Sequence, residues 1–469
     1  MATPRAVDAP PGSASADALN RTLVVVVIGS VMSVLDMTIV NVALRSLAEA
    51  FHAPLQTTQW AVTAYTLALA AVIPTTAWAM ARVGAKRAYL TALVLFTLGS
   101  LLAACAWSTV TLIAFRAVQG LGGGLLMPVG MAMAMGAADR DRYGRTMALL
   151  GLPILVGPVA GPVLGGWLLD ATSWRWIFLI NLPVGAVALA LAAKLLRPDA
   201  PRGTAPAPPL DVLGLLMLSP GLALLLFGLA HGGERGDFAS PGALVPALTG
   251  AALIAVFVRR ALSVRHPLLD LGLLADRTFA LGIATLALFT CGYFGSMLLG
   301  PVYWQQVRGW SPTATGLLGV PFGLAVGTTM QVAARSVDRV SPRRLIRAGI
   351  AVGALGMALT GLQIGAEDVP AWRLVCATAV IGVGSGMVLL PTMATASRDL
   401  PKDRMAAAST ALSINSQVCA SVGTALLSVV LGAAGPDPAG FRTAYLVAAG
   451  LLALALLPAT GLPAHSQKD

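Results

Sequence analysis

Charged residues are scarce in this sequence of 469 residues. Only 11% of the residues are charged, whereas 57% are hydrophobic and 6% are aromatic. A water-soluble globular protein carries roughly 25% charged residues, so this chain has less than half of the usual share. The deficit excludes most soluble enzymes and any disordered or fibrous protein. Together with the long apolar runs, it predicts an integral membrane protein.

Cysteine and histidine are also rare, with four residues of each. The cysteines are isolated and show neither a C-x-x-C pair nor metal-ligand spacing, so we expect small apolar side chains, no metal and no cofactor. The histidines fall in predicted loops or in the C-terminal tail. A membrane-embedded enzyme would need a nucleophile with its base, or metal ligands, at membrane depth. We therefore predict a protein that is not an enzyme.

The polar N-terminal segment lacks the basic start and short apolar core of a secretory signal peptide. The first apolar run, 21–44, is too long for a cleaved signal and is interpreted as a retained span.

A membrane-crossing helix needs about 20 mostly apolar residues, and the runs are too long for barrel strands. Fourteen spans are predicted: 22–44, 57–81, 88–107, 109–136, 146–169, 176–196, 212–231, 243–262, 278–306, 313–334, 345–365, 373–396, 406–433 and 442–462.

The 31 lysines and arginines give the chain a net charge of +11, but they do not form a continuous patch. They lie in short loops between the spans, so we expect no nucleic-acid partner. With the N-terminus in the cytoplasm, 24 of them fall on the cytoplasmic side, six on the outer side and one inside a span. Cytoplasmic loops are enriched in Lys and Arg, and both termini are therefore predicted to be cytoplasmic. Scarce lysine with abundant alanine and glycine suggests a bacterial inner membrane.

Two distant pairs of segments resemble each other. Residues 117–124 resemble 379–386, and the basic loop 81–87 resembles 338–344 at nearly the same offset. Two parallel six-span halves with two extra spans between them account for this offset, and chance likeness is the alternative. Such repeats are a transporter architecture with the substrate site between the halves. The predicted parts are a cytoplasmic tail (1–21), an N-terminal six-helix bundle (22–197), a Pro-rich linker (198–211), two inserted transmembrane helices (212–262), a cytoplasmic linker (263–277), a C-terminal six-helix bundle (278–462) and a cytoplasmic tail (463–469).

Asp36 and Arg116 are the two charged residues that lie well inside predicted spans. At 1.5 Å per residue, both lie slightly outward of the midplane at nearly equal depth. A charge there costs about 2.5–3.5 kcal/mol on insertion scales and marks a candidate functional site. Burial favours the neutral form of a carboxyl group and an adjacent guanidinium favours the ionised form, so Asp36 is interpreted as a reversible proton carrier and Arg116 as its modulator. A static ion pair that fixes helix packing is the alternative.

The fifth predicted span carries a run of small and helix-bending residues: Gly157, Pro158, Gly161, Pro162, Gly165 and Gly166. Prolines bend a helix, and small residues at four-residue spacing let another helix approach closely. This pattern suits a moving interface between bundles. An ordinary, tightly packed helix crossing is the alternative.

These features together resemble the major facilitator superfamily, specifically its fourteen-span drug–proton antiporter branch, from about residue 22 to 460. Segment 35–44 is similar to the span-1 motif of that branch. The span-4 motif is resembled by Arg116 together with Gln119 and the glycines that follow. Segment 157–166 resembles the antiporter motif. Segment 174–183 is also typical of the branch. The resemblance implies an all-α integral membrane protein of the major-facilitator-type fold, with two six-helix bundles plus two inserted helices. It further implies proton coupling through the span-4 arginine, and export rather than uptake.

The sequence departs from the family pattern at two places. Ala77 and Ala81 replace the glycine and aspartate of the loop motif after the second span, and Arg45 stands where the span-1 motif ends in proline. In the family, that aspartate belongs to a cytoplasmic charge network that latches the outward-open state, so this half of the latch lacks its acid. The predicted cytoplasmic gate residues are Arg82, Gly84, Lys86, Arg87, Asp338 and Arg339.

The function expected from these features is proton-driven export of small amphipathic compounds such as drugs, dyes, lipophilic cations or antibiotics. We expect a monomer in the lipid bilayer, driven by the proton gradient without a cofactor. Candidate substrate contacts are Asn41, Tyr65, Gln119, Phe294, Tyr303, Asn415 and Gln417. For each, a helix–helix hydrogen bond or an interfacial anchor is the alternative. The alternative functions are a proton-coupled uptake symporter, an exporter of a native metabolite or lipid, and a receptor or scaffold without transport.

Overall fold

The structure is a computed structural model that describes residues 13–138, 146, 149–199, 210–235, 237–264, 267–310, 312–336, 340–364, 369–435 and 437–464. Within these residues, every regular element is a helix. The first half of the chain forms α1 (Ser13–Ala50), α2 (Leu55–Val72), η1 (Ile73–Thr75), α3 (Thr76–Val83), α4 (Ala85–Ala104), α5 (Thr109–Ala137), α7 (Leu152–Ala171), α8 (Trp176–Leu179) and α9 (Asn181–Leu195).

Two helices separate this half from the last: α10 (Val212–Arg235) and α11 (Pro241–Ala261). The last half forms η3 (Leu271–Ala275), α12 (Arg277–Val302), η4 (Tyr303–Val307), α13 (Pro312–Leu318), α14 (Val320–Ser336), α15 (Pro342–Ile364), α16 (Ala371–Ser397), η5 (Lys402–Arg404), α17 (Met405–Ala434), α18 (Pro438–Leu454) and α19 (Leu456–Ala459). Among the described residues, 13 helical segments are long and apolar enough to cross a membrane. The 20-residue α7 occupies the place of the fifth predicted span, and the predicted all-α fold with its fourteen long helices is confirmed.

Prolines explain why several predicted spans are built from two helical pieces. Pro74 lies in η1 between α2 and α3, and Pro183 follows the junction of α8 and α9. Pro301 precedes the π-helical turn η4 at the end of α12. Each proline removes a backbone donor from the i→i−4 ladder, so the helix changes pitch at that point without ending the span.

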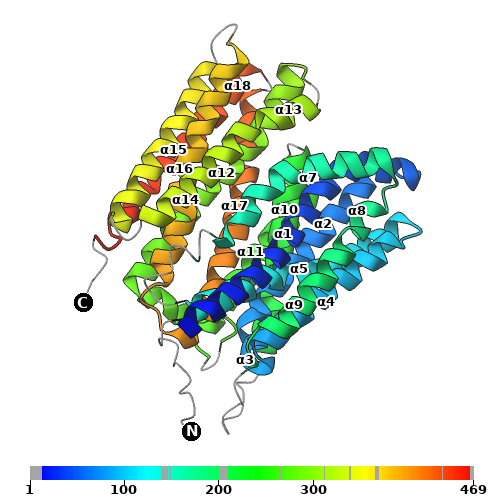
Figure 1. The fold of residues 1–469 in the computed structure, drawn as a ribbon. Coiled ribbons are helices and arrows are strands. Elements are labelled where there is room, and N and C mark those ends of the chain that lie inside the picture. Colours follow the sequence, from blue (N-terminus) through cyan, green and yellow to red (C-terminus); the bar gives the residue numbers. More distant parts are fainter. Residues whose placement is uncertain are drawn as a thin grey trace, which may run out of the picture.

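The helices form two bundles that join at one end (Figure 1). At the end where both termini lie, one hydrophobic core includes Leu23 and Met135 of the first half together with Met330 and Leu412 of the last. At the opposite end the cores are separate, because one contains only first-half residues and the other only last-half residues. The two halves are therefore packed together at the termini and diverge away from them.

The inserted helices α10 and α11 lie against both bundles on one side. The Ser219 hydroxyl of α10 donates a hydrogen bond to the Ala71 carbonyl of α2, and Phe227 stacks on Trp60 of α2 with ring centroids 5.4 Å apart. Towards the last half, Ile414 and Val418 of α17 pack onto the apolar core of the inserted pair. Through α10, the pair thus bridges α2 of the first bundle and α17 of the last.

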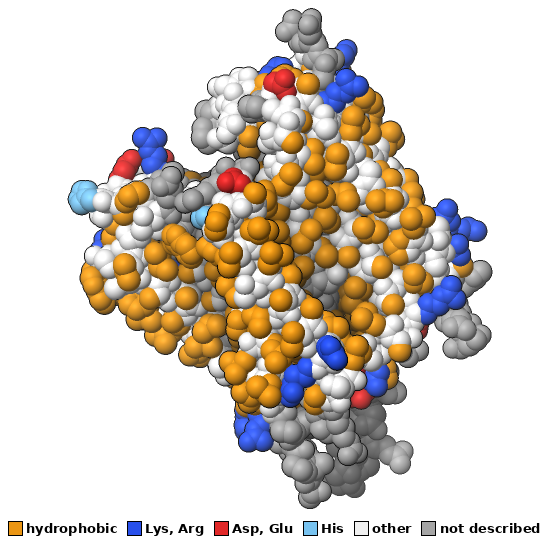
Figure 2. All heavy atoms as spheres, turned by 180° about the vertical axis from the view of Figure 1, so that it is seen from behind, with side chains coloured by type: hydrophobic (Ala, Val, Ile, Leu, Met, Phe, Trp, Pro, Cys, Tyr) orange, Lys and Arg blue, Asp and Glu red, His pale blue; other side chains and the backbone are white. Residues whose placement is uncertain are grey.

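The surface between the two ends of the molecule is apolar, and the charged side chains gather towards the ends (Figure 2).

Tryptophan is distributed unevenly along this axis. Eight of the nine tryptophans lie at the helix ends remote from the termini, and Trp78 of α3 is the exception. Five of the eight are exposed: Trp60, Trp107, Trp167, Trp176 and Trp372. Tryptophan is enriched at membrane–water interfaces, so these residues mark one membrane surface.

Candidate functional site

An ion pair between α1 and α5 lies at the centre of the first bundle. The Arg116 Nη1 atom donates to the Asp36 Oδ2 atom at 2.5 Å, and both side chains are fully buried. The sequence places these residues 80 positions apart, and the fold brings them into contact at the depth expected from the span boundaries. A buried charge is tolerated when it is paired and hydrogen-bonded, and both conditions are met here.

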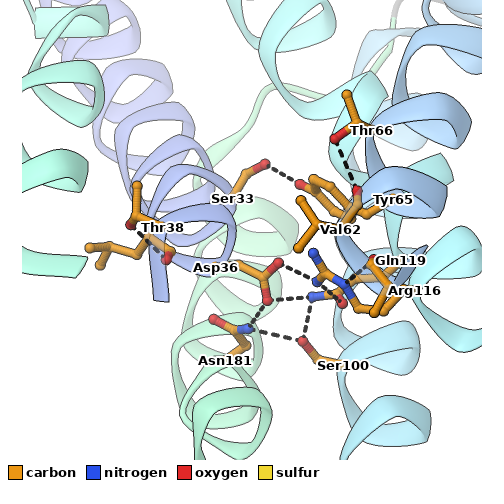
Figure 3. Close-up of polar contacts among 12 residues, drawn as sticks. Ser33, Asp36, Thr38, Val62, Tyr65, Thr66, Ser100, Arg116, Gln119 and Asn181 are labelled. Carbon is orange, nitrogen blue, oxygen red and sulfur yellow. Dashed lines mark hydrogen bonds and ion pairs between the residues drawn. The ribbon is translucent and has the colours of Figure 1, made fainter. Parts of the chain in front are cut away.

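Three further polar side chains complete the network around Asp36 (Figure 3). The amides of Gln119 and Asn181 each donate to Asp36 Oδ1 at 2.8 Å. The same two amides donate to Ser100 Oγ of α4, at 2.7 and 3.0 Å. Four helices, α1, α4, α5 and α9, therefore converge on one carboxylate.

The Arg116 guanidinium is held from several sides. Its Nη1 atom also donates to Gln119 Oε1 at 2.6 Å, and its Nε atom donates to the Ala61 carbonyl at 3.2 Å. The guanidinium carbon lies 4.2 Å from the centroid of the Tyr65 ring, close enough for a cation–π contact. Its buried Nη2 atom makes no hydrogen bond to the described residues, so the ring face is the neighbour that stabilises that part of the cation.

Glycines allow the helices to approach closely enough to form this network. A Cβ atom at Gly120 would overlap the Tyr65 carbonyl of α2, and one at Gly122 would overlap the Phe96 backbone of α4. Because α5 packs backbone to backbone against α2 and α4, the side chains of Arg116 and Gln119 are confined to the space between them.

The glycine face of α7 packs against α1 next to Asp36. A Cβ atom at Gly157 would overlap the Val34 side chain, and one at Gly161 would overlap Thr38. The Thr38 hydroxyl donates to the Gly157 carbonyl at 3.1 Å. Gly165 lies at Ile39, whereas Gly166 faces open space. Pro158 and Pro162 belong to the same helix. Because Gly157 and Gly161 lie against α1, the predicted glycine–proline helix contacts the helix that carries Asp36.

The candidate substrate contacts fall into two groups. Tyr65 and Gln119 are buried in the Asp36 network, and Tyr303 is buried against Phe441 in an aromatic cluster of the last half. Asn41 is exposed on α1, and Phe294, Asn415 and Gln417 are half-buried on α12 and α17. Gln417 lies beside Ala70 of α2 and Leu222 and Leu226 of α10. Their contact with a substrate stays a prediction.

The loop between α3 and α4 docks onto its own bundle. The Lys86 ammonium donates to the carbonyls of Ala193 and Leu196 at the end of α9, at 2.6 and 2.9 Å. In return, the carboxylate of Asp199 accepts hydrogen bonds from the backbone N–H groups of Lys86 and Arg87, at 2.9 and 3.3 Å. Gly84 adopts a φ of 92°, which favours glycine, and lies against that carboxylate.

Among the remaining gate residues, Arg82 lies in the last turn of α3. Asp338 and Arg339 lie outside the described residues. Asp199 had no predicted role, because it falls in the Pro-rich linker. It places a carboxylate at the loop where Ala81 replaces the family's aspartate, and it comes from the segment that follows α9.

The chemistry open to the central network is proton binding and release. Among the described residues, no group of three His, Cys, Asp or Glu side chains is placed to hold a metal ion. The network contains a carboxylate, a guanidinium, two amides and a hydroxyl, and of these the carboxylate is the group that can accept a proton.

Comparison with known proteins places the chain among transporters. Residues 26–424 match the family described as Major Facilitator Superfamily. The "Multidrug resistance protein B homolog" of Mycobacterium tuberculosis is 43% identical over 414 residues, covering 88% of this chain and 76% of that protein. MdtD of Cronobacter sakazakii is 34% identical over 463 residues, covering 95% of each chain.

A solved structure shows the same fold at low sequence identity. The crystal structure of the human organic anion transporter MFSD10 has a TM-score of 0.65 and 16% identity, covering 96% of this chain and 100% of that one. Together with the sequence matches, it confirms the resemblance noted in the sequence. The protein is thus a multi-pass membrane transporter of small molecules that belongs to the major facilitator superfamily, in its fourteen-span drug–proton antiporter branch.

Proposed function

We propose that this transporter is a proton-coupled antiporter that exports small amphipathic compounds, such as drugs, dyes, lipophilic cations or antibiotics, across a bacterial inner membrane. The observation that carries the proposal is the fully buried Asp36, paired with Arg116 at 2.5 Å and contacted by two amides. A buried acid inside a transport protein is a candidate proton carrier. The printed name of the M. tuberculosis relative, a multidrug resistance protein homolog, supports the substrate class.

In this proposal, the two bundles (22–197 and 278–462) rock against each other while the inserted pair (212–262) covers one side. With cytoplasmic termini, the joined end of the bundles faces the cytoplasm and the diverging end faces outward. Because Asp36 is fully buried, the helices around it would first have to separate at the outer end before it exchanges its proton with the outside. Rocking would then open the path to the cytoplasm, where the proton leaves and a substrate binds.

The proton gradient limits what such a cycle achieves. One charge crossing about 100 mV supplies about 2.3 kcal/mol, and each pH unit adds about 1.4 kcal/mol. Together, about 3.7 kcal/mol supports a substrate gradient of several hundredfold for a neutral compound. If one proton exchanges for one monovalent cation, the voltage contribution cancels and only the pH gradient remains.

Accessibility divides the candidate substrate contacts. Asn41, Phe294, Asn415 and Gln417 are at least partly accessible, so we assign first contact with a substrate to them. Tyr65 and Gln119 are occupied by the Asp36 network, and Tyr303 is packed in its cluster. These three would reach a substrate only after the surrounding helices rearrange.

Replacing Asp36 with Asn tests the proposal. The amide cannot carry a proton, so efflux driven by an imposed pH gradient should be lost in proteoliposomes while the protein still folds. Asp170→Asn, at an exposed position on α7, is the matched control and should transport like the wild type. If Asp36→Asn shows unchanged coupled efflux, Asp36 is not the proton carrier. If the wild type instead takes up the compound along the gradient, the protein is a symporter.

A further inference from the structure

Asn181 is the one member of the Asp36 network contributed by the sixth span. It is the first residue of α9, and its side chain is 4% exposed. Its Nδ2 atom lies 2.8 Å from Asp36 Oδ1 and 3.0 Å from Ser100 Oγ. The contact joins residues 145 positions apart, and Figure 3 shows the amide pointing at the carboxylate.

Each hydrogen bond between the Asp36 carboxylate and the described residues is donated to it. Oδ2 receives Arg116, and Oδ1 receives the amides of Gln119 and Asn181. A carboxylate accepts hydrogen bonds through both oxygens, whereas a protonated carboxyl group needs an acceptor for its own hydrogen. This donor set therefore matches the ionised form.

The two amides differ in how firmly they are oriented. Gln119 is fixed in its orientation, because its Oε1 atom accepts from Arg116 while its Nε2 atom donates to Asp36 and Ser100. Asn181 contributes only donor contacts to the network, both through Nδ2. Removing its side chain would delete one donor to Asp36 and leave the Arg116–Gln119 pair in place.

Few ionisable groups lie near Asp36. Arg116 faces it from α5, and Tyr65, whose hydroxyl bonds Ser33 at 3.1 Å, faces it from α2. From α8 the neighbour of the cation is Phe178. The glycine face of α7 carries no ionisable group where it meets Val34 and Thr38. Among the described residues of these helices, no second acid competes for the proton.

We propose that Asn181 is a positioning residue for proton coupling, whose side-chain amide stabilises the ionised form of Asp36 and so sets the pH at which the proton is released. This inference rests on the proposed function, because it assumes that Asp36 carries the proton. The proposal gives the sixth span a role in proton coupling through a neutral side chain.

The test compares pH profiles of two variants. Asn181→Leu removes the donor and keeps a branched side chain with the same number of heavy atoms, and Asn181→Asp keeps the shape but replaces the donor with an acid. Both changes favour the protonated form of Asp36. The probe is the lipophilic cation ethidium, and proton release on its binding is measured with a pH indicator in weakly buffered detergent solution. The pH of half-maximal release should rise by about one unit for Asn181→Leu, a tenfold change in proton affinity. For Asn181→Asp it should rise by at least as much.

A residue that only supports packing would lower transport at every pH without moving the midpoint. Ser30→Ala is the control, since Ser30 is buried on α1 and its hydroxyl contacts Met127 rather than Asp36. If Asn181→Leu does not fold, the isosteric Asn181→Asp decides the question. A folded variant with an unshifted or lowered midpoint overturns the inference.

Asp36→Asn separates this inference from the proposed function. If that variant keeps the wild-type proton release, Asp36 is not the carrier and both proposals fail. If proton release disappears in Asp36→Asn while the Asn181 variants keep the wild-type midpoint, the inference about Asn181 fails alone.

Discussion

The two bundles share their packing but not their chemistry. In the first half, Gly120 lies against the Tyr65 carbonyl, Gly122 against Phe96 and Gly124 against Leu69. In the last half, three glycines of α16 repeat these contacts at corresponding positions: Gly382 with Phe322, Gly384 with Gly353 and Gly386 with Val326. The helix crossings were thus kept in both copies.

The two polar side chains that α5 contributes to the Asp36 network have no equivalents at the matching places of α16. Where α5 carries Arg116 and Gln119, α16 carries Thr378 and Ile381 at the matching places in the repeat. The Thr378 hydroxyl donates to the Val375 carbonyl of its own helix at 2.9 Å, and Ile381 is packed in an apolar core. The glycine contacts between helices therefore recur in both bundles, whereas the Asp36–Arg116 ion pair lies in the first.

The largest expected difference between the halves comes from deleting the charged residue. Arg116→Ala leaves the buried carboxylate of Asp36 unpaired, which should lower the free energy of unfolding by about 3–5 kcal/mol. Thr378→Ala, at the matching position, should change it by less than about 0.5 kcal/mol. Thermal unfolding of the purified variants in detergent measures both. Adding Asp36→Asn to Arg116→Ala should recover part of the loss, and equal effects at the two positions would contradict the comparison.

Adding a methyl group to the central glycines should affect the two halves equally. Gly122→Ala and Gly384→Ala place a Cβ atom onto the backbone of a neighbouring helix, and each should lower the free energy of unfolding by about 1–3 kcal/mol. Gly136→Ala and Gly450→Ala, where a Cβ atom meets open space, are the controls and should leave stability unchanged or slightly raised. Sensitivity confined to one half would show that the packing is not equivalent.

The inserted pair offers a third region, in which a charged contact anchors one helix to the next. Arg260 of α11 contacts Asp211 at the start of α10 at 2.9 Å. Burial would raise the pKa of Asp211, but the Gly214 N–H and the Arg260 guanidinium outweigh it and hold that pKa below its usual value. The stabilisation is then present at neutral pH and lost as the pH falls below about 4.

Asp211→Asn should therefore lower the free energy of unfolding by about 1–2 kcal/mol at pH 7, the smallest of these effects. Because the stabilisation needs the ionised form, the difference between variant and wild type should shrink at about pH 3. Paired melting curves at the two pH values measure this. A difference that stays constant with pH would mean that the contact does not depend on the charge of Asp211.

Much of the fold could be predicted from the sequence because span length and charge placement are local properties. The predicted spans 212–231 and 243–262 correspond to α10 and α11 within a few residues. Asp36 and Arg116 could be singled out because an ionisable residue inside an apolar run is visible without any contact information.

The rest of the site depends on contacts across the chain. Ser100 is an ordinary small residue in an apolar helix, and Asn181 belongs to a motif that says nothing about where its side chain points. Asp199 lies in a linker whose composition predicts no partner. Their roles follow from helix packing over distances of 81 to 145 residues in the chain, which no local pattern contains.

The uneven distribution of tryptophan makes the protein's own fluorescence a reporter of one end of the molecule. Excitation of the indole rings samples almost exclusively the end remote from the termini, with Trp78 as the single contribution from the other. Trp304 and Trp310, with ring centroids 5.1 Å apart, are shielded beside Tyr303, whereas five other indoles are accessible. A quencher supplied from one side of a sealed vesicle will therefore show which way round the transporter has been inserted, without any added label.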